Sequence, residues 1–294
     1  MAGERWNFTP RRLPLITAEV AEDVLEAMER GQGSVSTSLD LWLSKVELIL
    51  ARKGLLIGSV EVSREELGAI SNDKRTVFSV TSDGLRPVEV RAVRYYKLVN
   101  CGRGRAPTLE IDGVHMHRVK DVSPTEDAIA KVRLLGRLND RKVLDTCTGL
   151  GYTAIEAVRR GAEVVTVELD ENVLTIAETN PWSAELGGER VQLIRGDAAE
   201  FVRELPTGHF DAVIHDPPRF SLAGELYSLE FYKELARVIR PGGRLVHYVG
   251  RPGSLSGKRL HVGVMRRLRD AGFSVRWVQG LDVVVGERAP RTPR

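Results

Sequence analysis

The chain has 294 residues, of which 42% are hydrophobic and 28% are charged. This length allows two modest domains or one α/β domain with a large extension, and the composition excludes a disordered, collagen-like or fibrous protein. The sequence shows no secretory signal, only two cysteines and no apolar run of the roughly 18 residues that a membrane helix needs. We therefore expect a cytoplasmic protein without disulfide bonds.

The net charge of +3 is unevenly distributed along the chain. Residues 126–239 contain 13 Lys/Arg and 20 Asp/Glu, a net charge of −7, whereas residues 240–294 contain 12 and 3, a net charge of +9. A basic segment beside an acidic one is typical of a protein that presents one surface to phosphates. A solvated helix followed by a polar tail explains the same pattern equally well.

The first part of the chain is predicted to be rich in β-strands. Short β-like runs cover residues 36–48, 54–62, 77–80 and 88–99, with one helix over 63–70. Asp112-Gly113 separates two further runs within 109–119 and favours a type I′ hairpin turn. We expect residues 1–122 to form a smaller β-rich N-terminal region that binds substrate.

From Ser123 the pattern changes to strands that alternate with helices. Ser123-Pro124-Thr125-Glu126 is a helix start, because Ser caps the helix, Pro suits its first position and Glu follows three residues after the cap. Alternation of this kind predicts an α/β domain with a mostly parallel, doubly wound sheet over residues 123–286, followed by a basic disordered tail at 287–294. The predicted strands are 143–146, 163–169, 191–195, 210–215, 244–249, 273–278 and 281–285, and the predicted helices are 123–138, 153–160, 171–178, 199–205, 224–239 and 258–271.

The loop after the first predicted strand indicates an adenosine-type ligand. Gly149, Gly151 and Ala154 match the spacing of the dinucleotide fingerprint, and Glu168 ends the next strand, where an acid would hold ribose hydroxyls. Asp145 argues against a dinucleotide as this ligand, because a carboxylate at this position would repel a pyrophosphate. S-adenosylmethionine carries a sulfonium and an ammonium group instead, so we expect Asp145 to face and attract this ligand. The same residue disfavours a nicotinamide oxidoreductase.

Acids follow the next strands as well. Asp197 follows the third strand and Asp216 the fourth. Ligands of open α/β sheets bind outside the carboxyl ends of the strands, so these acids are expected to converge with Asp145 and Glu168 on one crevice.

These motifs together resemble class I S-adenosylmethionine-dependent methyltransferases over about residues 123–286. The similar segments are Val143-Leu144-Asp145 to Gly151, Val167-Glu168-Leu169-Asp170, Arg195-Gly196-Asp197-Ala198, Asp216-Pro217-Pro218 and Pro241-Gly242-Gly243-Arg244-Leu245. The loop 145–154 and the upstream Leu-Glu-Ile-Asp-Gly also resemble a group of predicted archaeal methyltransferases. The resemblance implies a Rossmann-like seven-stranded sheet with an antiparallel last strand.

The same resemblance implies which residues bind S-adenosyl-L-methionine. Glu168 would hold the ribose hydroxyls and Asp197 would lie near the adenine, with Leu169 and Ala198 packed on its faces. The methionine part would be surrounded by Asp145, Gly149 and Gly151, and the same loop would add side-chain or backbone contacts from Thr146, Thr148 and Tyr152.

Asp216-Pro217-Pro218 is the predicted catalytic segment. Asp216 and the Pro217 carbonyl are placed to accept N–H protons from an amine and free its lone pair, and the two prolines make this geometry rigid. In amine-methylating relatives an aromatic residue follows the prolines and stacks on the base. Here Arg219 stands in that place and Phe220 follows, so either of these side chains would stack.

Three other features are weaker candidates. The segment 216–221 also resembles a loop of ribosomal-RNA cytosine-5 methyltransferases, but no cysteine follows Cys147, which disfavours their covalent chemistry. His115 and His117 have the spacing of metal ligands on one strand, without an apparent third ligand. The residues around Tyr95 and Tyr96 form either a nucleic-acid face or an ordinary half-exposed strand.

The leading hypothesis is an S-adenosylmethionine-dependent methyltransferase that methylates RNA (tRNA or rRNA) at a base nitrogen, with no metal. The alternative within the fold is methyl or aminopropyl transfer to a small, polyamine-like amine or a protein side chain, which suits the acidic middle segment. A non-catalytic RNA-binding module with a relic cofactor fold is a further alternative. The sequence does not identify the acceptor or the oligomeric state.

Overall fold

The computed structural model describes residues 2–250 and 260–290 and divides them into two compact units. The first unit comprises residues 1–8, 126–171 and 186–294, and the second comprises residues 9–125 and 172–185. Residues 1–8 group with the α/β unit, whereas residues 123–125 and 172–185 group with the β-rich one. No helix among the described residues is long and apolar enough to span a membrane.

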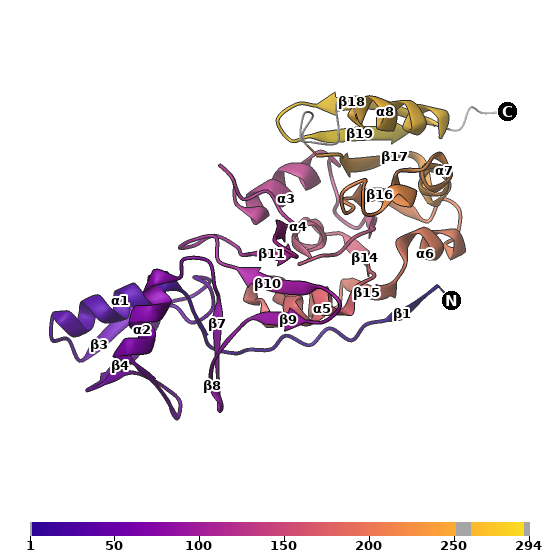
Figure 1. The fold of residues 1–294 in the computed structure, drawn as a ribbon. Coiled ribbons are helices and arrows are strands. Elements are labelled where there is room, and N and C mark those ends of the chain that lie inside the picture. The colour runs from indigo at the N-terminus through magenta and orange to yellow at the C-terminus, as the bar shows by residue number, and fades with distance from the viewer. Residues whose placement is uncertain (1, 251–259, 291–294) are drawn as a thin grey trace. The chain divides into compact units, whose positions relative to one another are not determined.

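The first unit is built on a mixed sheet in the order β1-β15-β14-β13-β16-β17-β19-β18 (Figure 1). Neighbouring strands from β15 to β17 are parallel, whereas β19 runs antiparallel to both β17 and β18, as the resemblance implied. The strands are β1 Gly3–Arg5, β13 Lys142–Asp145, β14 Glu163–Glu168, β15 Val191–Gly196, β16 Phe210–His215, β17 Ile239–Tyr248, β18 Phe273–Val278 and β19 Val283–Arg288.

The predicted count of seven strands is corrected to eight among the described residues of this sheet. The additional strand is β1, which pairs antiparallel with β15 through Gly3 and Gly196. The two glycines allow this pairing, because a Cβ on Gly196 would lie 2.5 Å from the Ala2 carbonyl oxygen. The predicted tail is also corrected, since residues 287–288 belong to β19; residues 291–294 lie outside the described part of the chain.

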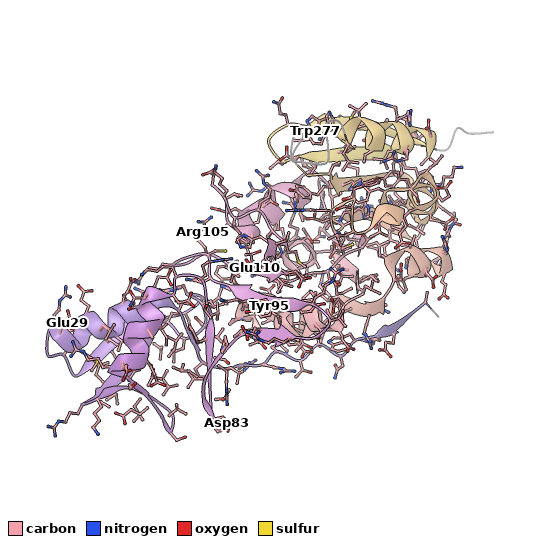
Figure 2. All side chains as sticks on the ribbon, viewed as in Figure 1. Glu29, Asp83, Tyr95, Arg105, Glu110 and Trp277 are labelled. Atoms are coloured by element: carbon pink, nitrogen blue, oxygen red, sulfur yellow. The ribbon has the colours of Figure 1, made fainter. Side chains whose placement is uncertain are left out.

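Helices flank this sheet and bury its strands. The helices α6, α7 and α8 pack in succession, and their apolar side chains share one core with Leu144, Val213 and Leu245 of the strands. Helix α8 lies along β18 and β19, where its His261 ring is 4.8 Å from that of Trp277, which Figure 2 labels. The helices of this unit are α3 Pro124–Arg133, α4 Tyr152–Arg159, α6 Ala198–Glu204, α7 Leu229–Val238 and α8 Leu260–Asp270, with the 3₁₀ turn η2 Gly224–Tyr227. Most residues of α5 Glu171–Thr179 and of the 3₁₀ turn η1 Pro181–Gly187 belong to the second unit.

The second unit contains three small antiparallel sheets, in the orders β3-β4-β5-β6, β2-β7-β8 and β12-β11-β10-β9. The expected hairpin at Asp112-Gly113 forms, and both residues have positive φ as a type I′ turn requires. The strands are β2 Leu15–Ile16, β3 Ser34–Thr37, β4 Val46–Ala51, β5 Gly54–Ile57, β6 Val60–Ser63, β7 Phe78–Thr81, β8 Gly84–Pro87, β9 Glu89–Arg91, β10 Tyr95–Val99, β11 Thr108–Ile111 and β12 Val114–His115.

One prediction for this unit was wrong, and one helix was not predicted. The predicted run over 36–48 is two strands joined by a loop, because Ser38 and Asp40 bond locally to the backbone of Trp42 and Ser44 and end the pairing. Helix α1 (Ala18–Glu29) was missed, although its buried positions recur at helical spacing. Helix α2 (Arg64–Asn72) was predicted, and a capping box between Ser63 and Glu66 starts it.

The loop between β13 and α4 depends on a glycine that no other residue can replace without strain. Gly151 has φ +80°, and a Cβ there would lie 2.5 Å from Cδ1 of the buried Leu186. Gly272 also has positive φ (+97°), but open space surrounds it. We expect Gly151→Ala to destabilise the protein by about 1–3 kcal/mol more than the matched control Gly272→Ala, measured by urea unfolding. Equal losses in the two variants would contradict a packing role for Gly151.

Candidate functional site

Four acidic residues stand at the carboxyl ends of four adjacent strands of the first unit. Asp145 ends β13 and Glu168 ends β14, whereas Asp197 and Asp216 directly follow β15 and β16. The sheet order places these strands side by side, so the four acids follow one another along the carboxyl ends of the parallel strands. The four carboxylates differ in burial and in their hydrogen-bond partners.

Asp145 lies inside the protein rather than on the surface of the loop. Its side chain has no exposed area; Oδ2 accepts a hydrogen bond from the Thr166 hydroxyl at 2.7 Å and Oδ1 one from Thr153 at 3.3 Å. Burial raises the pKa of Asp145 to about 7, and the charges of Asp216 and Glu168 add to this effect. This placement corrects the expectation of a fully charged carboxylate facing a ligand: Asp145 joins β13, β14 and α4 beneath the loop.

The threonines of the loop are also engaged internally. Thr146 is buried, and its hydroxyl lies 2.7 Å from Nδ1 of His215. The Thr148 hydroxyl lies 2.6 Å from that of Thr166, and its amide donates to the Val167 carbonyl. Tyr152 is likewise buried, as the first residue of α4. Both the hydroxyls and the backbone amides of Thr146 and Thr148 therefore make hydrogen bonds inside the protein.

Glu168 is the acid best placed to hold a ligand at the loop. It is half-buried; Oε2 accepts from the Gly149 amide at 2.8 Å and Oε1 from the Asp170 amide at 3.1 Å. These bonds bring its carboxylate against Gly149, whose φ of +55° turns the backbone. Burial raises the pKa of Glu168 above its ordinary value, although the two amide bonds oppose this effect.

Two apolar positions expected to border the adenine differ in exposure. The side chain of Leu169 is 65% exposed, which is unusual for leucine and leaves its surface available to a ligand. Ala198 is buried in the shared core of the first unit, so its predicted contact with an adenine face is not supported by its packing. Asp197 caps α6, since its Oδ1 accepts a hydrogen bond from the Ala199 amide at 2.7 Å, and this cap does not use Oδ2.

Asp216 belongs to an ionic cluster that sequence reasoning missed. Its Oδ2 accepts from Lys131 Nζ at 2.7 Å, and Nζ also lies 2.8 Å from Asp127 Oδ2. Both partners lie on α3, where the i, i+4 spacing of Asp127 and Lys131 was the available signal. Tyr248, at the end of β17, offers its ring to the same ammonium at 3.9 Å.

The two prolines after Asp216 are fixed by burial and by a hydrogen bond. Pro217 is buried, and the carbonyl of Pro218 accepts a 3.0 Å hydrogen bond from the Tyr227 hydroxyl. Phe220 stands edge-to-face on Tyr227 with 49% of its surface exposed. Phe220 therefore presents an exposed aromatic ring two residues after Pro218.

Two buried histidines support this segment rather than react. His215 Nε2 lies 2.9 Å from the Leu226 carbonyl, and burial lowers the pKa of His215 to about 3, so the ring is neutral and Nε2 is the donor. His247 Nδ1 lies 3.2 Å from the carbonyl of His215, and Nε2 lies 2.9 Å from the Tyr232 hydroxyl. Burial likewise lowers the pKa of His247 well below its ordinary value.

The remaining candidates are not brought into a site. Cys147 is partly buried against the core of the first unit, and burial raises the pKa of its thiol well above the ordinary value. His115 lies 3.2 Å from Glu110, and His117 lies 3.0 Å from the Thr108 hydroxyl. Glu110 lies on β11 and Tyr95 on the neighbouring strand β10 (Figure 2). Within residues 2–250 and 260–290, no group of three or more His, Cys, Asp or Glu side chains is arranged to hold a metal.

Comparison with solved structures shows which fold the α/β unit has. The chain is similar to a solved spermidine synthase in complex with the transition-state analogue AdoDATO, with a TM-score of 0.57, 17% identity and coverage of 69% of this chain and 73% of that one. A family model described as Conserved hypothetical protein 95 matches residues 114–237. The α/β unit therefore has the Rossmann-like fold of the spermidine synthases and methyltransferases.

Sequence relatives define the family. The uncharacterized protein MJ1233 of Methanocaldococcus jannaschii is 45% identical over 263 residues, which cover 88% of this chain and 89% of that protein. The chain belongs to the same family as this archaeal protein.

More distant relatives have named activities. Putrescine N-methyltransferase 4 of Nicotiana tabacum is 31% identical over 140 residues, and the polyamine aminopropyltransferase of Mycobacterium tuberculosis is 35% identical over 144 residues. Each match covers 46% of this chain, but only 36% and 27% of the respective relative. These relatives give no support to the RNA acceptor of the leading hypothesis and favour its alternative.

The raised pKa of Asp145 makes a pH-dependent contribution to stability. Unfolded aspartate loses its proton near pH 4, but folded Asp145 keeps it up to about pH 7, so the folded state binds more protons in this window and stability falls as pH rises through it. We expect Asp145→Asn to gain roughly 2–4 kcal/mol of unfolding free energy relative to wild type between pH 4 and pH 8. The effects of the two buried histidines are common to both proteins and cancel. A wild-type-to-variant difference that stays constant across this range, measured by urea unfolding, would show that Asp145 is not perturbed.

Proposed function

We propose that this chain is a transferase that moves a methyl or aminopropyl group from S-adenosyl-L-methionine or its decarboxylated form to the amine of a small molecule. The single observation that carries the proposal is the arrangement of Glu168 and Asp216 at the ends of β14 and β16, flanking the Gly149 loop. The named relatives support it, since one is a putrescine N-methyltransferase and another a polyamine aminopropyltransferase.

The residues at the strand ends fit an S-adenosylmethionine-type donor. The carboxylate of Glu168 is suited to a vicinal diol, because two acceptor oxygens match two hydroxyl donors. The exposed Leu169 and the capping carboxylate of Asp197 suit an adenine face and its amine. When bound, such a donor supplies an activated carbon on a positively charged sulfur, so the protein needs to supply alignment rather than a strong acid.

Asp216 is the proposed catalytic residue. Lys131 donates a hydrogen bond to its Oδ2 and orients the carboxylate, and Oδ1 is the atom proposed to accept an N–H of the acceptor amine. This bond would aim the nitrogen lone pair away from Asp216, toward the donor carbon. Pro217 and Pro218 restrict the backbone after Asp216, and Phe220 offers an apolar surface to the carbon chain of the acceptor.

The donor half of the proposal is tested at Glu168. We expect Glu168→Gln to weaken binding of S-adenosylhomocysteine by about tenfold or more, because the amide loses one charged acceptor, with calorimetry as the measurement. Glu163→Gln changes the acid at the opposite, exposed end of the same strand and serves as the matched control. Wild-type protein that binds none of S-adenosylmethionine, its decarboxylated form or S-adenosylhomocysteine would exclude the proposed donor.

The acceptor half is tested at Asp216. We expect Asp216→Asn to reduce transfer of label from the donor to small amines by about 10²–10⁴-fold while donor affinity changes little. Asp211→Asn, on the same strand but at the opposite end, is expected to retain transfer. The assay includes total RNA as a competing acceptor, and label that enters RNA instead of amines would reject the small-molecule acceptor.

A further inference from the structure

The exposed apolar side chains of the first unit are concentrated on two loops. Among its described residues, the exposed large hydrophobic side chains are those of Leu169, Phe220, Leu222 and Val262. Leu169 directly follows β14, which ends with Glu168. Phe220 and Leu222 lie on the loop that begins with Asp216, between β16 and η2. Exposed apolar side chains beside a few polar groups are typical of a ligand-binding surface, so this distribution favours an apolar ligand at these strand ends.

The aromatic ring of this surface is held in place. The ring of Phe220 stands edge-to-face on that of Tyr227, with their centres 5.4 Å apart, and 49% of Phe220 remains exposed. Tyr227 is itself buried, and its hydroxyl donates to the Pro218 carbonyl at 3.0 Å. Phe220 is therefore fixed by the buried ring that it contacts and keeps half of its surface for a partner, which is the preorganised state that favours binding.

Leu222 lies on the same loop, within a hydrogen-bonded turn. The amides of Leu222 and Ala223 donate to the Arg219 carbonyl at 2.8 and 3.2 Å, so the chain folds back on itself here. The side chain of Leu222 is nevertheless 62% exposed. Residues 217–223 contain no Asp or Glu, so this turn offers a ligand apolar contacts and no carboxylate.

The proposed catalytic carboxylate lies close to this surface. Burial raises the pKa of Tyr227 above its ordinary value, and Tyr232 and Asp216 add to this effect electrostatically. The pair of Phe220 and Tyr227 is therefore within electrostatic reach of Asp216. An acceptor amine that meets Asp216 has an apolar surface beside it for the rest of its carbon chain.

As an extension that rests on the proposed function, we propose that the acceptor is an amine with an apolar body, an alkylamine or arylalkylamine. Its hydrocarbon part packs on Phe220 and Leu222 while its nitrogen meets Asp216. Each methylene group that leaves water on this surface strengthens acceptor binding, because burial of apolar area is favourable. The length of the hydrocarbon part then determines which amines the protein prefers.

The surface is tested by the dependence of binding on chain length. In the presence of saturating S-adenosylhomocysteine, n-octylamine is expected to bind about tenfold or more tightly than n-butylamine, because its longer chain buries more apolar area, with calorimetry as the measurement. Leu222→Ser and Phe220→Ser are each expected to lower this ratio by about threefold or more. Val262→Ser, at a similarly exposed apolar residue of α8, is the matched control and is expected to keep the wild-type ratio. A wild-type ratio near one, or an unchanged ratio in both loop variants, would overturn the inference.

Transfer assays with the same two amines distinguish failure of this inference from failure of the proposed function. Transfer to n-butylamine and n-octylamine with equal kcat/KM would overturn the apolar acceptor and leave the proposed function intact. Preferential binding of n-octylamine that depends on Leu222, without transfer to any amine, would reject the proposed function and leave the apolar surface established. A dimer that Leu222→Ser dissociates, detected by sedimentation, would assign the surface to a second copy of the chain and overturn the inference.

Discussion

Four carboxylates stand at the carboxyl ends of adjacent parallel strands in the mixed sheet, and the protein holds each of them with different partners. It uses a different solution for each one. Asp145 is buried and raised in pKa to about 7, with two threonine hydroxyls as donors. Glu168 accepts two backbone amides, Asp197 caps a helix, and Asp216 is paired with Lys131. These partners also determine how exposed each carboxylate is and how many further hydrogen bonds it can accept from a ligand.

These environments separate a fully buried acid from the partly exposed acids that we propose to bind ligand. Asp145 has no exposed area, so its contribution is to hold the loop in place through β14 and α4. Glu168 and Asp216 retain partial exposure, and both are positioned by bonds that use only some of their acceptor capacity. The electrostatic argument for a cationic donor therefore depends less on Asp145 than on Glu168 and Asp216.

Neutral polar side chains link the strand ends of the site to the neighbouring loop and helices through hydrogen bonds. His215 connects Thr146 of the glycine loop to η2 through its two ring nitrogens, and His247 connects the backbone of β16 to Tyr232 of α7. Tyr227 bonds the Pro218 carbonyl and packs against Phe220. Burial keeps both imidazoles uncharged, so these groups act as fixed connections between strand ends and helices rather than as acids or bases.

The sequence alone determined the alternation of strands and helices, the glycine loop, the acids at four strand ends and the hairpin turn at Asp112-Gly113, because these features depend on local propensity and periodicity. It did not determine β1, whose pairing needs an edge strand distant in sequence, or the loop within the predicted run 36–48, which local side-chain bonds create. Only the tertiary structure decided that Asp145 points into the core and that Lys131 pairs with Asp216, 85 residues away. Burial and long-range ion pairing depend on which elements pack together. A motif at the end of a strand does not specify which distant residues become its neighbours in the fold.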